Sequence, residues 1–238
     1  MLSQQAFDPS FWAEHQRGES ADYRQVFEEV HPQVFVGRIL SKSWCEDLLS
    51  TVSEYERKLE GESPAPSNSM HEAAILTEAL GLTVAMNELA LTCLSPVARQ
   101  LYPEHLPADL SGQHSYVVRY GEDEDWDLDF HVDDSQVTLN LCLSENFEGA
   151  ELVLEGVRCP IHVDTPSMDE ELFEWTHQPG VALLHLGKNR HRVRRIQSGR
   201  RINLIVWGQE ESERGLWLRA FHAGRCLPWC PKNPAYQG

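Results

Sequence analysis

Residues 180–207 read GVALLHLGKNRHRVRRIQSGRRINLIVW, and this stretch decides the fold. Its two ends, 180–186 and 201–207, are short apolar runs of the kind that forms strands, and the turn GKNR (187–190) and a basic segment separate them. Short runs of similar character occupy residues 115–120, 136–143 and 150–157. Strands this short and this regularly spaced predict a β-sandwich or a β-barrel.

The N-terminal half of the chain has a helical pattern instead. Apolar residues recur at helical spacing over 44–55, and either Ser41 or Ser43 is placed to cap the start of that helix. A second apolar-periodic helix is predicted over Leu82–Leu101, and Pro103 closes it. The two patterns together predict helices that pack against a β-rich half.

The change of pattern near residue 112 suggests an α+β organisation in one structural unit. We expect a helical flank at 1–111, a barrel core at 112–210 and a cysteine-containing tail at 211–238. The segment GESPAPSNS (61–69) predicts a loop. A long acidic insertion at 164–177 lies between two predicted strands, where it is either a lid, a binding loop or plain surface.

Charge narrows the choice of partners. The chain has 238 residues, a formal net charge of −17 and 41% hydrophobic residues, which is a globular composition. The acidic balance argues against nucleic acid or an anionic membrane as partner. The sequence shows no apolar run of membrane-spanning length and no secretory signal pattern, so we expect a cytoplasmic or nuclear protein.

The charge is unevenly distributed along the chain. Residues 188–201 hold 7 Lys and Arg and no acid, whereas residues 121–134 hold 8 Asp and Glu. We expect the two blocks to meet at one site, with some of the arginines facing solvent.

His131-Val132-Asp133 is the first candidate metal motif. In an extended chain residues i and i+2 project to the same side, so the imidazole and the carboxylate can converge. A second histidine would complete a 2-His-1-carboxylate face with open positions, as non-haem Fe(II) oxygenases require. The alternative is an exposed acidic turn, since carboxylates crowd the surrounding sequence.

Four histidines are candidates for the third ligand: His162, His177, His185 and His191. His191 follows a turn and precedes Arg201, which can grip a carboxylate with two parallel hydrogen bonds. His185 lies within an apolar strand, where a hydrogen-bonded core histidine is the commoner case. The context therefore favours His191.

These residues carry a resemblance to a known family. The motifs FHVDDSQVTLN (130–140), LHLGKNRHRV (184–193) and GRRINLIVW (199–207) resemble the iron- and 2-oxoglutarate-dependent dioxygenase domain of the prolyl/lysyl-hydroxylase type. More narrowly, the chain resembles PKHD-type hydroxylases and 2-oxoglutarate and iron-dependent oxygenase domain-containing proteins. The likeness covers most of the chain from about residue 30. Gly149-Ala150-Glu151 departs from the family's usual Gly-Gly pair.

The resemblance implies a double-stranded β-helix, also called a jelly-roll barrel. It implies that His131, Asp133 and His191 hold Fe(II), that Arg201 binds the distal carboxylate of 2-oxoglutarate and that Tyr120 hydrogen-bonds this co-substrate. The implied reaction uses O2 to hydroxylate a protein or peptide side chain, with succinate and CO2 as co-products and ascorbate as reductant.

Strand parity adds further candidates. Thr138, Asn140 and Cys142 share one strand face, while Asn203, Ile205 and Trp207 share the face of Arg201. Thr138 and Asn203 are therefore candidate co-substrate contacts. Because buried polar groups need partners, the amides of Asn140 and Asn203 either form hydrogen bonds with polar groups in the core or contact a bound ligand.

Three other functions remain open from the sequence. RINLIVW partly resembles the R-x-N-x-T-x-R of alkylated-base demethylases, but Ile205 and Trp207 replace two of its residues, and the charge opposes nucleic acid. A small-molecule substrate is a further alternative. A metal-binding jelly-roll module without turnover is the third, although it has no need of Arg201.

The cysteines suggest a second metal site. Six cysteines without a secretory signal are expected to be free thiols or metal ligands. Cys159, His162, Cys226 and Cys230 have ligand-like spacing and could form a Cys3His structural zinc site, with His222 as a competing ligand. The alternative is a set of reduced thiols without metal.

Overall fold

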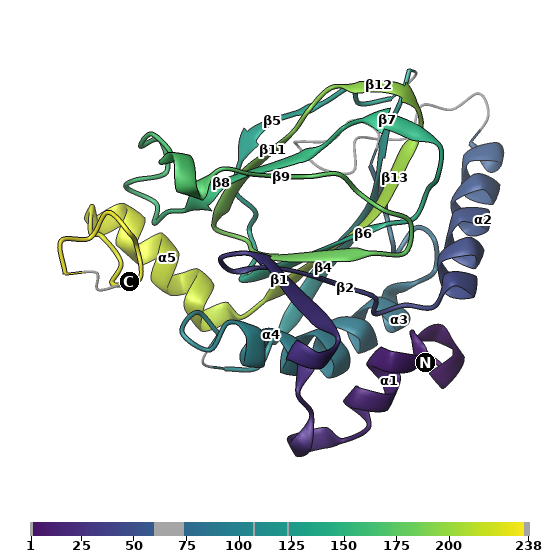
Figure 1. Cartoon of the computed structure of the whole chain (residues 1–238), viewed down its shortest axis with the longest axis horizontal. Helices are drawn as coiled ribbons and strands as arrows, with labels where there is room; N and C mark the ends of the chain where they lie inside the picture. Colours follow the sequence, from purple (N-terminus) through teal and green to yellow (C-terminus); the bar gives the residue numbers. More distant parts are fainter. Residues whose placement is uncertain (1, 60–73, 107, 123, 236–238) are drawn as a thin grey trace.

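The structure, a computed structural model, describes residues 2–59, 74–106, 108–122 and 124–235. The loop predicted at 61–69 lies outside the described residues. Two β-sheets face each other, and most of the helices pack below and beside the larger one, with α5 at the far left of the view (Figure 1). The chain is thus of mixed helix and strand character.

The helices are α1 (Pro9–His15), α2 (Lys42–Lys58), α3 (Thr83–Glu88), α4 (Ser95–Leu101) and α5 (Glu211–Ala223). The strands are β1 (Phe27–His31), β2 (Val34–Gly37), β3 (Ile75–Leu76), β4 (Gly112–Tyr120), β5 (Leu128–His131), β6 (Val137–Cys142), β7 (Phe147–Gly149), β8 (Leu152–Val157), β9 (Phe173–Trp175), β10 (Ala182–Leu186), β11 (Asn189–Val193), β12 (Ile196–Gly199) and β13 (Arg201–Gln209).

The larger sheet has the order β1-β2-β10-β6-β13-β4-β3, and the smaller sheet has the order β5-β11-β8-β9. A separate two-stranded ribbon joins β12 and β7. The described strand pairs are antiparallel. All five predicted strand runs fall in β4, β6, β8, β10 and β13.

Strand β13 shows how the sequence builds two cores. Its residues alternate, so that Leu204 and Val206 pack in the core that the helices share with the larger sheet. Ile205 and Trp207 pack in the core between the two sheets. The predicted parity of β13 is confirmed, and it points Arg201 between the sheets.

Helix α2 begins as predicted, because the Ser41 hydroxyl accepts a hydrogen bond from the Trp44 backbone N–H at 3.3 Å. The second predicted helix is a continuous run with a π-helical segment at Leu89–Leu94 between α3 and α4. Pro96 at the start of α4 accounts for this irregularity, since proline donates no helical hydrogen bond and crowds the preceding turn.

The structure adds elements that the sequence did not predict. The N-terminal flank contributes β1, β2 and β3 to the larger sheet, and β2 pairs with β10. The C-terminal tail contains α5. None of the helices in the described part of the chain combines the length and hydropathy needed to cross a bilayer.

The central place of β13 predicts a large stability loss on truncation. Leu204 is 0% exposed, so Leu204→Ala should lower the free energy of unfolding by about 2–5 kcal/mol through lost burial and a residual cavity. Val84 is 64% exposed, so Val84→Ala should change it by less than about 0.5 kcal/mol. Urea denaturation compares the two; equal losses would contradict this packing.

Candidate active site

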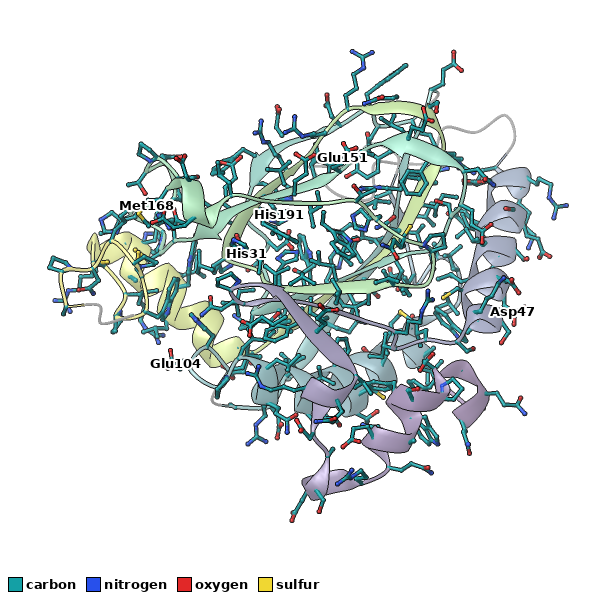
Figure 2. All side chains as sticks on the ribbon, viewed as in Figure 1. His31, Asp47, Glu104, Glu151, Met168 and His191 are labelled. Atoms are coloured by element: carbon teal, nitrogen blue, oxygen red, sulfur yellow. The ribbon has the colours of Figure 1, made fainter. Side chains whose placement is uncertain are left out.

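Two histidines meet across neighbouring strands of the smaller sheet. His131 ends β5, His191 lies in the middle of β11, and the two residues face each other directly in the antiparallel register. Their ring centroids are 4.1 Å apart. Figure 2 places His191 between the two sheets, where β13 also points its inward side chains.

Asp133 lies just beyond β5 in the turn that leads to β6. Its backbone N–H donates to the Gly187 carbonyl at 2.8 Å, which fixes the turn against the link between β10 and β11. A Cβ at Gly187 would lie 2.2 Å from the Ser135 carbonyl oxygen, so glycine is required for this close approach.

The geometry of His131, Asp133 and His191 suits a metal ion. The Asp133 Oδ1 atom lies 3.7 Å from His131 Nε2 and 3.6 Å from His191 Nε2. Two ligands at about 2.1 Å from one ion can be at most about 4.2 Å apart, and both separations meet this limit. The three ligand atoms lie within 4.8 Å of one another.

Backbone hydrogen bonds orient both imidazoles. His131 Nδ1 donates to the Asp129 carbonyl at 2.7 Å, and His191 Nδ1 donates to the Asn189 carbonyl at 2.8 Å. Because the proton is then on Nδ1, each Nε2 keeps its lone pair and points it toward Asp133.

The carboxylate of Asp133 is held in its charged form. Burial alone raises its pKa, but the neighbouring histidines, His191 foremost, and the Thr138 hydroxyl outweigh burial and lower it. The Thr138 hydroxyl donates to Asp133 Oδ2 at 2.5 Å and also lies 2.8 Å from the Ser135 hydroxyl. Thr138 thus positions the carboxylate from behind.

One pocket contains this cluster and also Arg201. Its lining side chains are Tyr116, Val118, Tyr120, Leu128, His131, Asp133, Thr138, Asn140, Leu152, His185, His191, Val193, Arg201 and Ile205. The predicted residues Tyr120, Thr138 and Arg201 therefore share one pocket with the His-Asp-His cluster.

Arg201 is a buried cation without a carboxylate partner among the described residues. It is 1% exposed, its guanidinium lies 4.3 Å above the centre of the Tyr120 ring, and its Nη1 donates to the Ala150 carbonyl. Its Nε has no partner. Burial lowers the pKa of Arg201, yet a guanidinium stays protonated, so the site favours an anion.

Asn203 lies behind the pocket rather than in its lining. Its Nδ2 donates to Asn140 Oδ1 at 2.6 Å and lies 3.3 Å from His177 Nδ1, while its Oδ1 has no partner. The amides of Asn140 and Asn203 thus satisfy each other in part. A contact between Asn203 and the co-substrate stays a prediction.

His185 is a pocket residue that sequence reasoning assigned to the core. Its Nδ1 donates to the Leu186 carbonyl at 2.9 Å, but its Nε2 is buried without a partner, and its ring lies 4.7 Å from that of His191. Burial lowers the pKa of His185 to about 4, which keeps it neutral. His185 faces the pocket because it pairs with Thr138, and the sequence alone does not give this pairing.

The two charged blocks meet as predicted. Strands β5 and β11 pair, and the Arg200 Nε donates to both carboxylate oxygens of Glu124 at 3.0 and 3.1 Å. Other arginines of the basic block face outward in ion pairs, such as Arg194 with Glu174 at 2.7 Å. Arg190 and Arg201 are instead buried.

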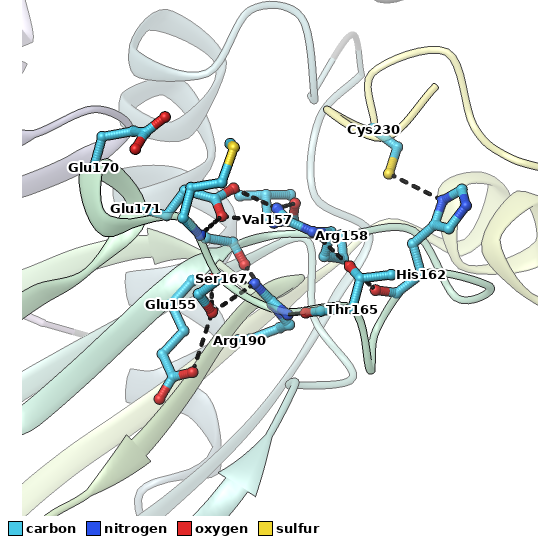
Figure 3. A network of polar contacts seen from close by, with 12 residues as sticks. Glu155, Val157, Arg158, His162, Thr165, Ser167, Glu170, Glu171, Arg190 and Cys230 are labelled. Atoms are coloured by element: carbon cyan, nitrogen blue, oxygen red, sulfur yellow. Dashed lines mark hydrogen bonds and ion pairs between the residues drawn. The ribbon is translucent and has the colours of Figure 1, made fainter. Parts of the chain in front are cut away.

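The acidic insertion at 164–177 forms a strand in part and is held against the smaller sheet by hydrogen bonds and an ion pair. Its residues 173–175 form β9, which pairs with β8. Arg158 donates to both carboxylate oxygens of Glu171 at 2.5 and 2.6 Å, and Arg190 donates to the Thr165 carbonyl and, at 3.0 Å, to the Ser167 hydroxyl (Figure 3). These contacts hold the segment on the smaller sheet.

Comparisons with known proteins find relatives that carry a 2-oxoglutarate and iron-dependent oxygenase domain. Residues 1–106 match the model of the OGFOD2-like domain. The 2-oxoglutarate and iron-dependent oxygenase domain-containing protein ICU11 of Arabidopsis thaliana is 37% identical over 203 residues, covering 84% of this chain and 51% of that protein. The 2-oxoglutarate and iron-dependent oxygenase domain-containing protein 2 of Danio rerio is 30% identical over 210 residues, covering 87% of this chain and 55% of that protein. This chain is a homologue of these oxygenase-domain proteins.

The chain spans about half the length of these curated homologues. A solved structure shows the same fold: a prolyl hydroxylase from Trichoplax adhaerens, in complex with a peptide fragment of the hypoxia inducible factor oxygen degradation domain. It aligns with a TM-score of 0.56 and 14% identity, covering 90% of this chain and 99% of that one.

The hydrogen bond from Thr138 predicts an effect on metal affinity. Thr138→Val keeps the side-chain shape but removes the donor to Asp133, so divalent-metal affinity should fall about 10- to 100-fold. Thr92→Val, which removes an exposed helix-surface hydroxyl, is the control and should bind metal normally. Titration with Mn²⁺ measures both; equal affinities would exclude this role for Thr138.

Proposed function

We propose that this chain is an Fe(II)- and 2-oxoglutarate-dependent dioxygenase that hydroxylates a side chain of a protein or peptide. The observation that carries the proposal is the joint presence of His131, Asp133, His191 and Arg201 in one pocket. A cluster that only binds metal has no need of a buried arginine beside it. The homology to oxygenase-domain proteins supports the same class.

The fold part of this proposal is a double-stranded β-helix. Strands β4-β13-β6-β10 would form one half of the barrel, and β5-β11-β8-β9 would form the other. The likeness to a solved prolyl hydroxylase supports this interpretation. The active site would then lie between the halves, with its ligands on β5 and β11.

In the proposed reaction His131, Asp133 and His191 hold Fe(II) through one oxygen and two nitrogens, the 2-His-1-carboxylate set of such oxygenases. Fe(II) held there would supply the chemistry of O2 activation, for which 2-oxoglutarate would provide electrons on conversion to succinate and CO2, with ascorbate as auxiliary reductant. The protein's own part is to orient both imidazoles through their Nδ1 hydrogen bonds and to keep Asp133 ionised.

Arg201 would anchor the distal carboxylate of 2-oxoglutarate. A guanidinium offers two parallel donors to a carboxylate, and burial next to Tyr120 removes the water that competes for them. The free Nε and the fixed Nη1 of Arg201 leave donors for such an anion. Tyr120 would add a contact from β4.

A protein or peptide substrate fits the charge of the chain better than nucleic acid does. The net charge of −17 repels a polyanion, and Arg194 and Arg200 of the basic block are already paired with Glu174 and Glu124. The Trichoplax adhaerens enzyme of the same fold holds a peptide fragment. We extend that substrate class to this chain as part of the proposal.

Arg201→Lys tests the co-substrate assignment. Lysine keeps the charge but loses the planar fork, so the KM for 2-oxoglutarate should rise about 10- to 100-fold in an assay of succinate formation. Arg194→Lys, which alters an exposed ion pair, is the matched control and should leave KM unchanged. An unchanged KM for Arg201→Lys would count against this anchor.

A peptide-panel assay tests the substrate class. Peptides incubated with the Fe(II)-loaded enzyme and 2-oxoglutarate should gain the mass of one oxygen atom, and His131→Ala should abolish both this gain and succinate formation. Oxidation of an alkylated oligonucleotide in the same assay, without any peptide product, would contradict a protein substrate. If the metal-loaded protein turns over none of the substrates tested, the result would favour a metal-binding module without catalysis.

A further inference from the structure

Four potential zinc ligands converge at the end of the barrel that faces α5. Cys159 and His162 follow β8, whereas Cys226 and Cys230 lie beyond α5. All four ligand atoms lie within 4.8 Å of one another, although the two pairs are far apart in sequence. This cluster is separate from the His131-Asp133-His191 group and shares no residue with it.

The distances in this cluster are those of a tetrahedral site. His162 Nδ1 lies 3.4 Å from the Sγ atoms of both Cys159 and Cys226, and 3.6 Å from that of Cys230. The Sγ atoms of Cys159 and Cys226 are 3.7 Å apart. Ligands at Zn–S and Zn–N distances of about 2.3 and 2.1 Å form a tetrahedron with edges of roughly 3.5–3.8 Å.

The surroundings also fit bound thiolates. The Cys159 and Cys230 side chains are fully buried and the cysteines are free rather than disulfide-bonded. The backbone N–H of Cys159 donates to Cys230 Sγ at 3.5 Å, a contact that stabilises negative charge on sulfur. Two buried thiolates and the partly exposed one of Cys226 would repel each other without a cation between them.

We propose that Cys159, His162, Cys226 and Cys230 bind one structural Zn²⁺ ion. Soft thiolates in a tetrahedral set select zinc, whereas the nitrogen and oxygen ligands of the other cluster suit Fe(II). All four positions are filled by protein side chains, so no site is left open for a substrate. The zinc is therefore structural.

The ion would fasten the C-terminal segment to the barrel. Ala220 and Leu227 form a small separate core with Cys159 and Cys230, which is limited support for a helix and a tail. Figure 3 shows Cys230 beside His162, next to the loop that Arg158 and Arg190 hold. A zinc ion would join that loop and the tail at one point.

This anchor also reaches the candidate active site. On α5, the Trp217 ring lies 4.7 Å from Lys188 Nζ, and Lys188 donates to the Asp133 carbonyl at 2.6 Å. Zinc would thus hold α5 where Trp217 supports Lys188, which in turn supports the turn that carries Asp133.

Metal analysis of the purified full-length chain tests the proposal. The protein is treated with an iron chelator, which is then removed by dialysis. We expect one zinc per chain to remain both in the wild type and in Asp133→Ala, which lacks the carboxylate ligand of the His131-Asp133-His191 cluster. Cys226→Ser should lose the zinc, and Cys45→Ala, which changes a buried cysteine elsewhere, should keep it. Zinc that disappears in Asp133→Ala but remains in Cys226→Ser would overturn the assignment.

Two measurements on the wild type keep the test independent of whether variants fold. Co²⁺ exchanged into the zinc site should give the intense thiolate charge-transfer absorption of a tetrahedral centre. Removal of zinc with a strong chelator should make the segment after α5 sensitive to limited proteolysis, and added zinc should restore protection. Zinc-free protein with the same resistance, or a disulfide between Cys159 and Cys226 in a non-reducing mass spectrum, would refute the site.

Discussion

The antiparallel pairing of β5 with β11 is the constraint on which the candidate site depends. It places His131 opposite His191, and each strand also supplies the carbonyl that orients its own imidazole. A slip of one residue would turn one histidine to the outer face of the sheet. The strand register thus positions the two histidines, and the hydrogen bond from the Asp133 backbone N–H to the Gly187 carbonyl positions the Asp133 carboxylate beside them.

The second constraint is a buried positive charge. Arg201 starts β13, a strand paired on both sides with β4 and β6, and the Ala150 carbonyl accepts a hydrogen bond from it. Ala150 has a φ of 55°, a left-handed backbone conformation that costs a non-glycine residue about 1–2 kcal/mol. This turn aims the Ala150 carbonyl at Arg201. The Ala150 carbonyl and the Tyr120 ring are the partners of the Arg201 guanidinium, and a bound dianion would add the opposite charge.

The sequence predicted the parts of the fold that have strong periodicity. The five apolar strand runs, a helix start capped by Ser41 or Ser43 and the shared face of the β13 residues followed from side-chain pattern alone, and the structure selects Ser41. β5, β9 and β11 were missed because they are short and polar and gain their order from neighbouring strands. His185 was assigned to the core because an apolar strand gives no sign that its inward face borders a pocket. The two cysteine pairs were visible by spacing, but their convergence needed the tertiary fold.

The central claim is that one pocket holds a metal and 2-oxoglutarate together. A crystal structure of the chain grown anaerobically with Mn²⁺ and 2-oxoglutarate tests it most directly. The account predicts the metal's anomalous signal between His131, Asp133 and His191, with the distal carboxylate of 2-oxoglutarate paired with Arg201. Metal bound elsewhere, or a co-substrate carboxylate that does not contact Arg201, would contradict it.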